Sequence, residues 1–243
     1  MKKDFLFELE KTIFKISQPN HINYERSSKK VDILHYAIHR HLSLYLDKEK
    51  YKICSKVIDK KEYKVEGLLF DKKADIAILN VVKNKVVATI ELKLYLSSVQ
   101  KNLKNSLSNM IGETANIQLN DIKTFWILNA RSVTPVYDES KKVKSFYKIN
   151  QSFFDKYLDM YNKIKSNKYL MPSRLLINVY DDNLDIQKFS SKREILQEIN
   201  NFEIKNNFNF RYDNNYIFND NKLYVNCYDK FIKKICEEIM YEE

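Results

Sequence analysis

Three side chains in the central part of the sequence have the types and spacing of a hydrolytic site: Asp75, Glu91 and Lys93. The polar gap at residues 83–85 separates two β-leaning runs and is typical of a tight antiparallel turn. A three-residue turn places Asp75 opposite Lys93, with Glu91 as its diagonal neighbour. Because side chains alternate along a strand, Glu91 and Lys93 also share one face of the sheet. We therefore expect the three polar groups to converge on one side.

Two carboxylates held close together repel each other, and a divalent cation between them removes that repulsion. Mg²⁺ is the expected cofactor, because its preferred protein ligands are oxygens. Such a site keeps several waters, lowers the pKa of one of them and accepts phosphate oxygens, as hydrolysis of a phosphodiester requires. Lys93 would orient or help to deprotonate the attacking water and offset the charge on the phosphorane.

The elements that must position these residues follow the order helix, three-stranded meander, helix, strand. They are predicted from the helical spacing of apolar residues and from β-leaning runs with polar gaps between them. The predicted bounds are 33–46 for the first helix, 63–70, 74–82 and 86–94 for the meander, 97–118 for the second helix and 124–128 for the last strand. The apolar face of the meander, opposite the polar groups, is formed by Ile76, Ile78, Ile90 and Leu92.

The rest of the chain predicts further helices and strands. A helix is predicted over 4–17, before the core elements. Beyond residue 131 we expect a hairpin or charged loop at 137–147, a helix at 153–165 and a strand at 175–180. A further helix begins with a capping box at 191–194 and ends at about 200, and an amphipathic helix follows at 228–240. The fold class expected is α+β (α/β), with a mixed central sheet flanked by helices. Residues 1–243 would form one domain, with a core at about 31–131 and additional C-terminal elements at about 132–243.

The segment Ala74-Asp75-Ile76-Ala77-Ile78, followed by Ile90-Glu91-Leu92-Lys93, resembles the core of the PD-(D/E)xK nuclease superfamily. Its restriction-endonuclease-like core has the order α-β-β-β-α-β, and the resemblance covers roughly residues 31–129. It implies that Asp75 and Glu91 are metal ligands, that the main-chain carbonyl of Leu92 is a further ligand, and that Lys93 is the catalytic lysine. Ala74 departs from the family's pattern, which has proline before the aspartate.

Other interpretations of the acidic and metal-binding residues stay open. Asp75, Glu91 and Lys93 also fit an ordinary cross-strand ion-pair cluster on a solvated sheet face. Glu66, on the preceding predicted strand, is a candidate for an additional acidic ligand or for a purely structural residue. His35 and His39 have the i, i+4 spacing of helical zinc ligands, but no third ligand is evident, so helix packing or proximity to DNA is the favoured interpretation.

The charge of the chain is compatible with a polyanionic partner. With 42 Lys and Arg against 32 Asp and Glu, the formal net charge is +10, a surplus typical of proteins that bind nucleic acids. Codon usage in an AT-rich genome also favours lysine and explains part of the surplus. Candidates for contacts to DNA lie on the polar face of the helix over 97–118 and just after the last core strand, although a solvated surface explains them nearly as well. They are Gln100, Lys101, Lys104, Asn105 and Arg131.

Composition and length narrow the class of protein. Three irregularly spaced cysteines favour reduced thiols, and the sequence has no run of eighteen uncharged apolar residues. We expect a soluble cytoplasmic protein with no membrane partner. The chain is too short for several enzymatic activities and has no Gly-rich phosphate loop.

The function that these observations favour is a Type II restriction endonuclease. It would be a homodimer that uses Mg²⁺ to cut double-stranded DNA at a specific sequence, with a cognate DNA methyltransferase encoded nearby. The resemblance implies 5′-phosphate ends and one nuclease domain over residues 1–243, with its catalytic core at about 31–131 and C-terminal recognition and dimerisation elements at about 132–243. One alternative is a repair, recombination or junction-resolving nuclease of the same superfamily. Another is a DNA-binding protein without catalytic activity.

Overall fold

A mixed β-sheet forms the centre of the molecule. The computed structural model describes residues 1–18, 31–164, 167–204, 210–220 and 222–241. The strands of the main sheet lie in the order β1 (Tyr51–Ser55), β4 (Ile76–Asn80), β5 (Lys85–Tyr95), β6 (Lys123–Arg131), β9 (Arg174–Asp181), β12 (Leu223–Val225) and β11 (Phe218–Asp220), and β10 (Arg211–Tyr212) pairs with β9. The neighbours β1, β4 and β5 are antiparallel, whereas β5, β6, β9 and β12 run parallel.

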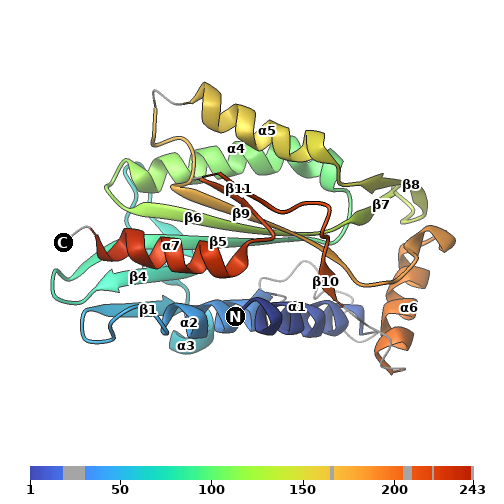
Figure 1. The fold of residues 1–243 in the computed structure, drawn as a ribbon, viewed down its shortest axis with the longest axis horizontal. Coiled ribbons are helices and arrows are strands. Elements are labelled where there is room, and N and C mark those ends of the chain that lie inside the picture. The colour runs from blue at the N-terminus through green and yellow to red at the C-terminus, as the bar shows by residue number, and fades with distance from the viewer. Residues whose placement is uncertain (19–30, 165–166, 205–209, 221, 242–243) are drawn as a thin grey trace.

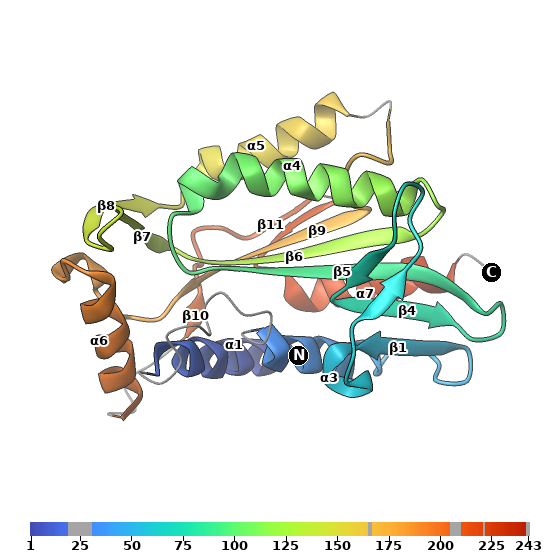
Figure 2. The ribbon, with the colours of Figure 1, turned by 180° about the vertical axis from the view of Figure 1, so that it is seen from behind.

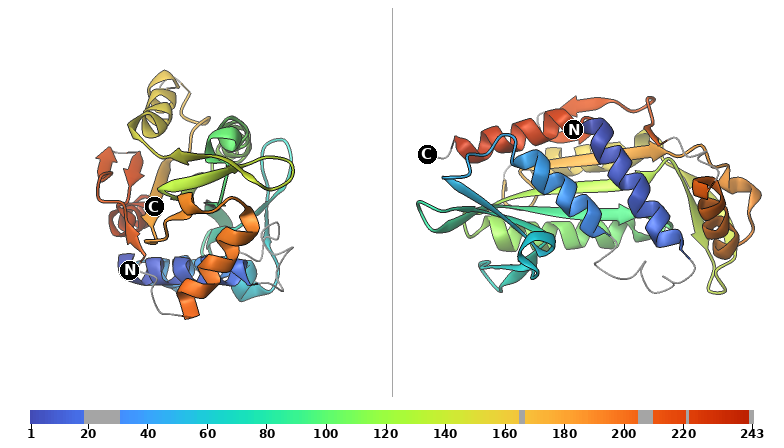
Figure 3. Two further views of the ribbon diagram at one scale, coloured as in Figure 1. Left: turned by 90° about the vertical axis from the view of Figure 1, so that its right-hand side faces the viewer. Right: turned by 90° about the horizontal axis from the view of Figure 1, so that it is seen from below.

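Helices cover both faces of this sheet (Figures 1 and 3). The face formed by the even-numbered residues of the central part of β5 packs with α1 (Lys2–Ser17), α2 (Asp32–Leu42) and α7 (Tyr228–Met240). The opposite face packs with α4 (Val99–Gln118) and α5 (Gln151–Lys163). The alternation of side chains along each strand produces these two cores, because neighbouring residues point to opposite faces. As predicted, the first core contains Ile76, Ile78, Ile90 and Leu92.

Smaller elements lie around the sheet. They are α3 (Lys56–Asp59), the hairpin of β2 (Tyr63–Val65) and β3 (Lys72–Ala74), the hairpin of β7 (Val133–Tyr137) and β8 (Val143–Lys148), the 3-10 helix η4 (Ile186–Lys188), and α6 (Lys192–Ile204). Figure 2 shows the hairpin of β2 and β3, in cyan, rising from the level of α3 towards the end of α4. No helix in the described part of the chain is both long enough and apolar enough to span a membrane.

The predicted α+β class with a mixed, helix-flanked sheet is confirmed. The helices predicted at 97–118 and 228–240 correspond to α4 and α7, and the buried strand at 124–128 lies within β6. The composition of the meander was predicted wrongly. Its first strand is β1, which the sequence pattern missed, and residues 63–65 form a separate hairpin instead.

A side chain on α4 explains why the run at 63–70 does not continue as a strand. The buried amide of Asn116 accepts hydrogen bonds from the main-chain N–H of Leu69 at 2.9 Å and of Phe70 at 3.3 Å, and donates one to the carbonyl of Phe70 at 2.9 Å. The N–H of Leu68 is bonded to the Asn116 carbonyl at 2.8 Å. These bonds occupy main-chain groups that a sheet ladder would otherwise use.

The register of β4 and β5 also differs from the predicted one. The turn lies at residues 81–84 rather than 83–85, and a bulge falls between Ile78 and Leu79. Ile76 pairs with Ile90, so the next position, Asp75, is level with Glu91 rather than with Lys93. A bulge adds one residue to one of the two strands, and no sequence signal marks its position here.

Candidate active site

Glu91 lies in the middle of the sheet, on the face covered by α4. It belongs to the central strand β5 and pairs in parallel register with Trp126 of β6. Only 5% of its surface is exposed. A carboxylate in such a position needs hydrogen bonds or a cation to remain charged.

Lys72 supplies a cation to Glu91. Its ammonium group lies 3.0 Å from Oε2 of Glu91 and 2.5 Å from Oε2 of Glu113, which projects from α4. The hairpin of β2 and β3 carries Lys72, and Asn116 fastens the tip of that hairpin to the same helix. The fold of the hairpin therefore delivers the lysine to the two carboxylates.

Neither Lys72, which is paired with Glu91, nor Glu113, which is paired with the same lysine, was a candidate from the sequence. Lys72 gives no signal, because it lies in a charged run that is typical of a turn. Glu113 does give one, since it follows Met110 by three residues and precedes Ile117 by four. Both of those residues are buried, so Glu113 places a charge on the helix face that packs against the sheet.

Asp75 lies in a bend between β3 and β4, at the edge of the same cluster. Its Oδ2 accepts a hydrogen bond from the main-chain N–H of Leu92 at 2.8 Å. The N–H and C=O of one strand residue point towards the same neighbouring strand, so the carbonyl of Leu92 faces the side where Asp75 lies. Oδ2 of Asp75 is also 3.9 Å from Nε2 of His35, a buried residue of α2.

Lys93 lies two residues beyond Glu91 on the same face. It is partly buried, and its ammonium group lies 5.4 Å from the centre of the Trp126 ring. The ammonium group of Lys72 lies 5.8 Å from the same ring. The electron-rich face of an indole favours a nearby cation. The sequence placed Trp126 only in a buried strand. In the structure its ring lies close to the ammonium groups of both lysines.

The negative charges around Glu91 are not fully compensated by Lys72. Burial and the nearby charge of Asp75 raise the pKa of Glu91 to about 8, although Lys72 acts in the opposite direction. Burial alone would lower the pKa of Lys72, but Glu91 and Glu113 raise it above its usual value. Burial lowers the pKa of His35, with Asp75 opposing that effect. The charged form of Glu91 is therefore under-stabilised even beside Lys72, and an additional cation would favour it.

The donor set suits a hard divalent cation. Among the described residues, no group of three or more His, Cys, Asp and Glu side chains has the arrangement of a metal site, so a metal here would rest on two carboxylates and a main-chain carbonyl. Asp75 and Glu91 supply carboxylate oxygens and Leu92 supplies the carbonyl, which are ligands that Mg²⁺ accepts while it keeps several waters. The raised pKa of Glu91 is the observation that favours such an ion.

Two predicted site residues lie elsewhere. Arg131 was expected to contact DNA, but it is buried, forms an ion pair with Asp182 and donates a hydrogen bond to the carbonyl of Leu184 at 3.0 Å. It is therefore not available to a phosphate. Glu66 is exposed in the loop after β2, and in the described contacts only its carbonyl is bonded, to Asn120. No described contact joins its carboxylate to Asp75 or Glu91.

The predicted DNA-contacting residues of α4 lie near the start of the helix. Gln100, Lys104 and Asn105 are exposed, and the side chain of Lys101 lies outside the described part. Val99 and Leu103 of the same turns are buried against the sheet. The polar face that the sequence predicted for this helix is thus a solvent-facing surface.

The three histidines of α2 have different surroundings. His41 is bonded through Nδ1 to the hydroxyl of Tyr228 at 2.8 Å and through Nε2 to the carboxylate of Asp4 at 2.7 Å. His35 faces Asp75, and His39 is half-buried. Helix packing thus accounts for His41, and among the described residues no group of three His, Cys, Asp or Glu side chains forms a zinc site at His35 and His39.

Comparison with known proteins found no relative of this chain. No protein-family model, curated protein or solved structure matches the chain.

Proposed function

We propose that this protein is a Mg²⁺-dependent endonuclease of the PD-(D/E)xK type that hydrolyses double-stranded DNA at a specific sequence, as a Type II restriction endonuclease does. The observation that carries the proposal is the pairing of partly buried Asp75 with buried Glu91, in which Glu91 has a pKa near 8 and Lys93 follows on the same strand face. Metal-dependent hydrolysis of a phosphodiester needs this combination of carboxylates and a cation.

The order of elements supports the same proposal. The helix α2 is followed by the antiparallel strands β1, β4 and β5, then by α4 and the parallel strand β6. The short hairpin of β2 and β3 is an insertion between β1 and β4. Without the insertion, this is the α-β-β-β-α-β order of a restriction-endonuclease-like core.

Each residue of the cluster has a role in the proposed reaction. Asp75, Glu91 and the carbonyl of Leu92 would hold Mg²⁺, which lowers the pKa of a bound water and neutralises charge on the phosphate. Lys93, held beside Trp126, would orient the attacking water and offset the negative charge that develops on the phosphorus centre. Lys72 would lower the energetic cost of ionising Glu91 and hold its carboxylate in a fixed position between β5 and α4.

The surface near the start of α4 would contact the DNA. Lys101 and Lys104 would bind phosphates, while Gln100 and Asn105 would position or recognise bases. The net charge of +10 would provide the long-range attraction. A homodimer is the form that cuts both strands of a palindromic site. The protein would act in the cytoplasm, with a cognate DNA methyltransferase encoded nearby.

Cleavage of a mixed-sequence plasmid tests this proposal. The protein is incubated with the plasmid in Mg²⁺ and in EDTA, and the ends of the products are sequenced. We expect discrete bands with 5′-phosphate ends in Mg²⁺ and no cleavage in EDTA. Glu91→Gln and Asp75→Asn should abolish cleavage, whereas the matched control Glu66→Gln, at an exposed carboxylate, should retain it. Full activity in Glu91→Gln would contradict the site assignment.

The same experiment separates the alternatives. Smeared products, degradation from ends or cleavage confined to junctions would indicate a repair or recombination nuclease instead. A DNA-binding protein without catalytic activity has one specific observation in its favour, because Lys72 already forms an ion pair with Glu91. Retention of DNA with no hydrolysis in Mg²⁺ or Mn²⁺, unchanged by Asp75→Asn, would support that alternative.

A further inference from the structure

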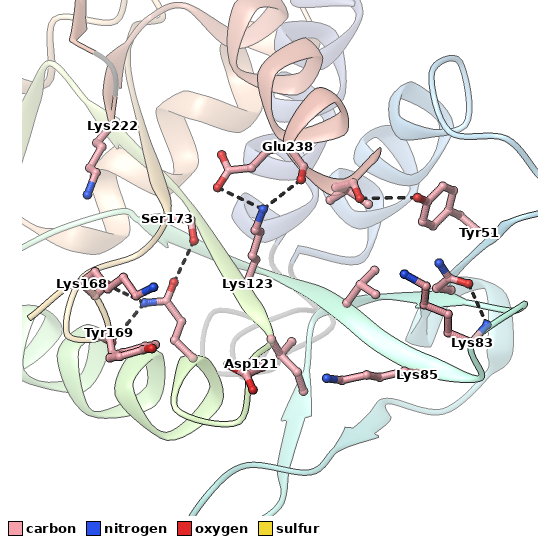
Figure 4. A pocket seen from close by; sticks show the side chains of 15 residues that line it. Tyr51, Lys83, Lys85, Asp121, Lys123, Lys168, Tyr169, Ser173, Lys222 and Glu238 are labelled. Atoms are coloured by element: carbon pink, nitrogen blue, oxygen red, sulfur yellow. Dashed lines mark hydrogen bonds and ion pairs between the residues drawn. The ribbon is translucent and has the colours of Figure 1, made fainter. Parts of the chain in front are cut away.

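A lysine-rich pocket lies at the end of the sheet where the parallel strands begin (Figure 4). Its volume is about 580 Å³, within the range of small-molecule sites. The lysines that line it are Lys83, Lys85, Lys123, Lys168 and Lys222. They come from the turn after β4, from the starts of β5 and β6, and from the segments before β9 and β12. Distant parts of the chain therefore contribute positive charge to one hollow.

The acidic side chains of the lining do not balance these lysines. The lining contains Asp121 and Glu238. Glu238 is bonded to Nε of Arg174 at 2.6 Å and also lies 3.7 Å from Nζ of Lys123, so two cations share its charge. In the described chain no carboxylate forms an ion pair with Lys85, Lys168 or Lys222. The pocket thus has a surplus of positive charge.

Hydrogen bonds hold the wall of the pocket in place. The buried amide nitrogen of Gln118, at the end of α4, donates to the carbonyls of Tyr169 at 3.1 Å and Met171 at 2.8 Å, and its oxygen accepts from the hydroxyl of Ser173 at 2.8 Å. The N–H of Leu175 is bonded to the carbonyl of Lys222 at 2.8 Å. The backbone that carries the lysines is therefore fixed before a ligand binds, which reduces the entropic cost of binding.

The pocket also has surfaces that suit a planar ring. Tyr169 contributes a partly exposed aromatic side chain and Val87 a partly exposed aliphatic one, whereas Tyr51 and Ile239 of the lining are almost fully buried. The ammonium group of Lys168 lies 5.1 Å from the Tyr169 ring. A ligand that matches both parts of the pocket has several negative charges and one apolar, planar group.

We propose that this pocket binds a phosphorylated nucleoside, with its phosphates at Lys168 and Lys222, which lie on the same side of the pocket (Figure 4), and its base against the apolar side chains of the lining. Lysine ammonium groups are compact charges with three rotatable donors, which suits a phosphate chain. Lys85 and Glu91 are six positions apart on β5, a separation of about 20 Å along an extended strand. The pocket is thus distinct from the acidic cluster, and the proposal does not depend on nuclease activity.

Isothermal titration calorimetry with the full chain tests the proposal. ATP is titrated without added metal, with pyrophosphate and adenosine as partial ligands. We expect ATP to bind, pyrophosphate to bind more weakly and adenosine not to bind detectably. The double variant Lys168→Met/Lys222→Met should weaken ATP binding at least about tenfold, since each lost charge-assisted contact is expected to cost more than one neutral hydrogen bond. The matched control Lys144→Met, on β8 at the far end of the molecule, should leave it unchanged.

Competition identifies the source of the nucleotide. If a 5′-phosphorylated single-stranded oligonucleotide displaces ATP and loses this ability in the double variant, the pocket holds a nucleotide of a nucleic acid strand. If the oligonucleotide does not displace ATP, the ligand is a free nucleotide. Absence of ATP and pyrophosphate binding, or ATP binding that the double variant leaves intact, would overturn the proposal. Neither result depends on whether Glu91→Gln loses cleavage.

Discussion

Two buried clusters of charge differ in how well they are balanced. Arg131, at the end of β6, forms an ion pair with Asp182, and both side chains are almost fully buried. The guanidinium also bonds the carbonyl of Leu184, and the carboxylate accepts the N–H of Leu184 at 3.2 Å. Burial keeps the pKa of Asp182 above its usual value, although Arg131 and this N–H act in the opposite direction. One cation faces one anion, and the hydrogen bonds satisfy both.

The cluster around Glu91 lacks this balance. Lys72 bridges two carboxylates, Glu91 and Glu113, and Asp75 adds a further negative charge that raises the pKa of Glu91. A balanced buried pair contributes to the structure, whereas a buried carboxylate with a strongly raised pKa is more often part of a functional site. Arg131 therefore has a structural role, whereas Glu91 is a candidate for the proposed chemistry.

The largest expected effect is on the balanced pair. Arg131→Met should lower the free energy of unfolding by about 3–5 kcal/mol, because it leaves the charge of Asp182 buried without a partner. The double variant Arg131→Met/Asp182→Leu should recover most of that loss, since no buried charge remains. Urea unfolding at pH 7 measures both. A loss below about 1 kcal/mol in the single variant would show that the pair is not structural.

Glu91 should make stability depend on pH. Its pKa is raised from 4.5 to about 8, so the folded state binds a proton that the unfolded state releases, and the free energy of unfolding falls as the pH rises across this window. Each unit of the raised pKa corresponds to about 1.4 kcal/mol. Urea unfolding of wild type and Glu91→Gln at pH 5, 6.5 and 8 isolates this contribution. We expect Glu91→Gln to match wild type at pH 5 and to exceed its stability at pH 8; equal stability at both pH values would refute the buried, under-stabilised carboxylate.

Lys72→Met should have a smaller, pH-dependent cost. At pH 8, which is near the pKa of Glu91, the ionised fraction of this carboxylate loses its bonded cation, at a cost of up to about 1–3 kcal/mol. At pH 5 Glu91 is largely protonated, and the remaining cost comes from Glu113, whose side chain is about one-third exposed. The same urea series measures the difference. An equal cost at the two pH values would mean that Lys72 does not stabilise the charged form of Glu91.

Lys93→Met should have the smallest effect on folding and a large effect on activity. The described contact of its ammonium group is with the Trp126 ring, and loss of a partly exposed cation–π contact costs less than about 1 kcal/mol. Plasmid cleavage should fall by more than about a hundredfold, as when one group that stabilises transition-state charge is removed. Loss of stability comparable to that of Arg131→Met would instead place Lys93 with the structural charges.

Local patterns predicted much of the fold. The apolar spacing of α4 and α7 identified both helices, and the alternation of β5 placed Glu91 and Lys93 on the face opposite Ile90 and Leu92. The strand β1 escaped detection because it is five residues long, with exposed Lys52 as its clearest sign of alternation. The strand β1 pairs with β4, which lies beyond the hairpin of β2 and β3 in the sequence, so this pairing is not a local feature.

The candidate site was predicted in part. Asp75, Glu91 and Lys93 could be named from residue type and the period of the strands. The register of their strands could not be predicted, because the bulge at Ile78 and the turn at 81–84 place Asp75 level with Glu91. Arg131 was misassigned for a related reason: its partner Asp182 follows a different strand, about fifty residues later in the chain.

By itself, the sequence determined the amphipathic helices, the alternation of the central strands and the surplus of positive charge, because these depend on residues a few positions apart. Tertiary structure decided which charges meet. Asn116 brings the hairpin to α4 and so brings Lys72 to Glu91, and the starts of the parallel strands bring five lysines from four segments to one pocket. Electrostatic interaction depends on distance and burial, and both are fixed only when segments remote in sequence pack together.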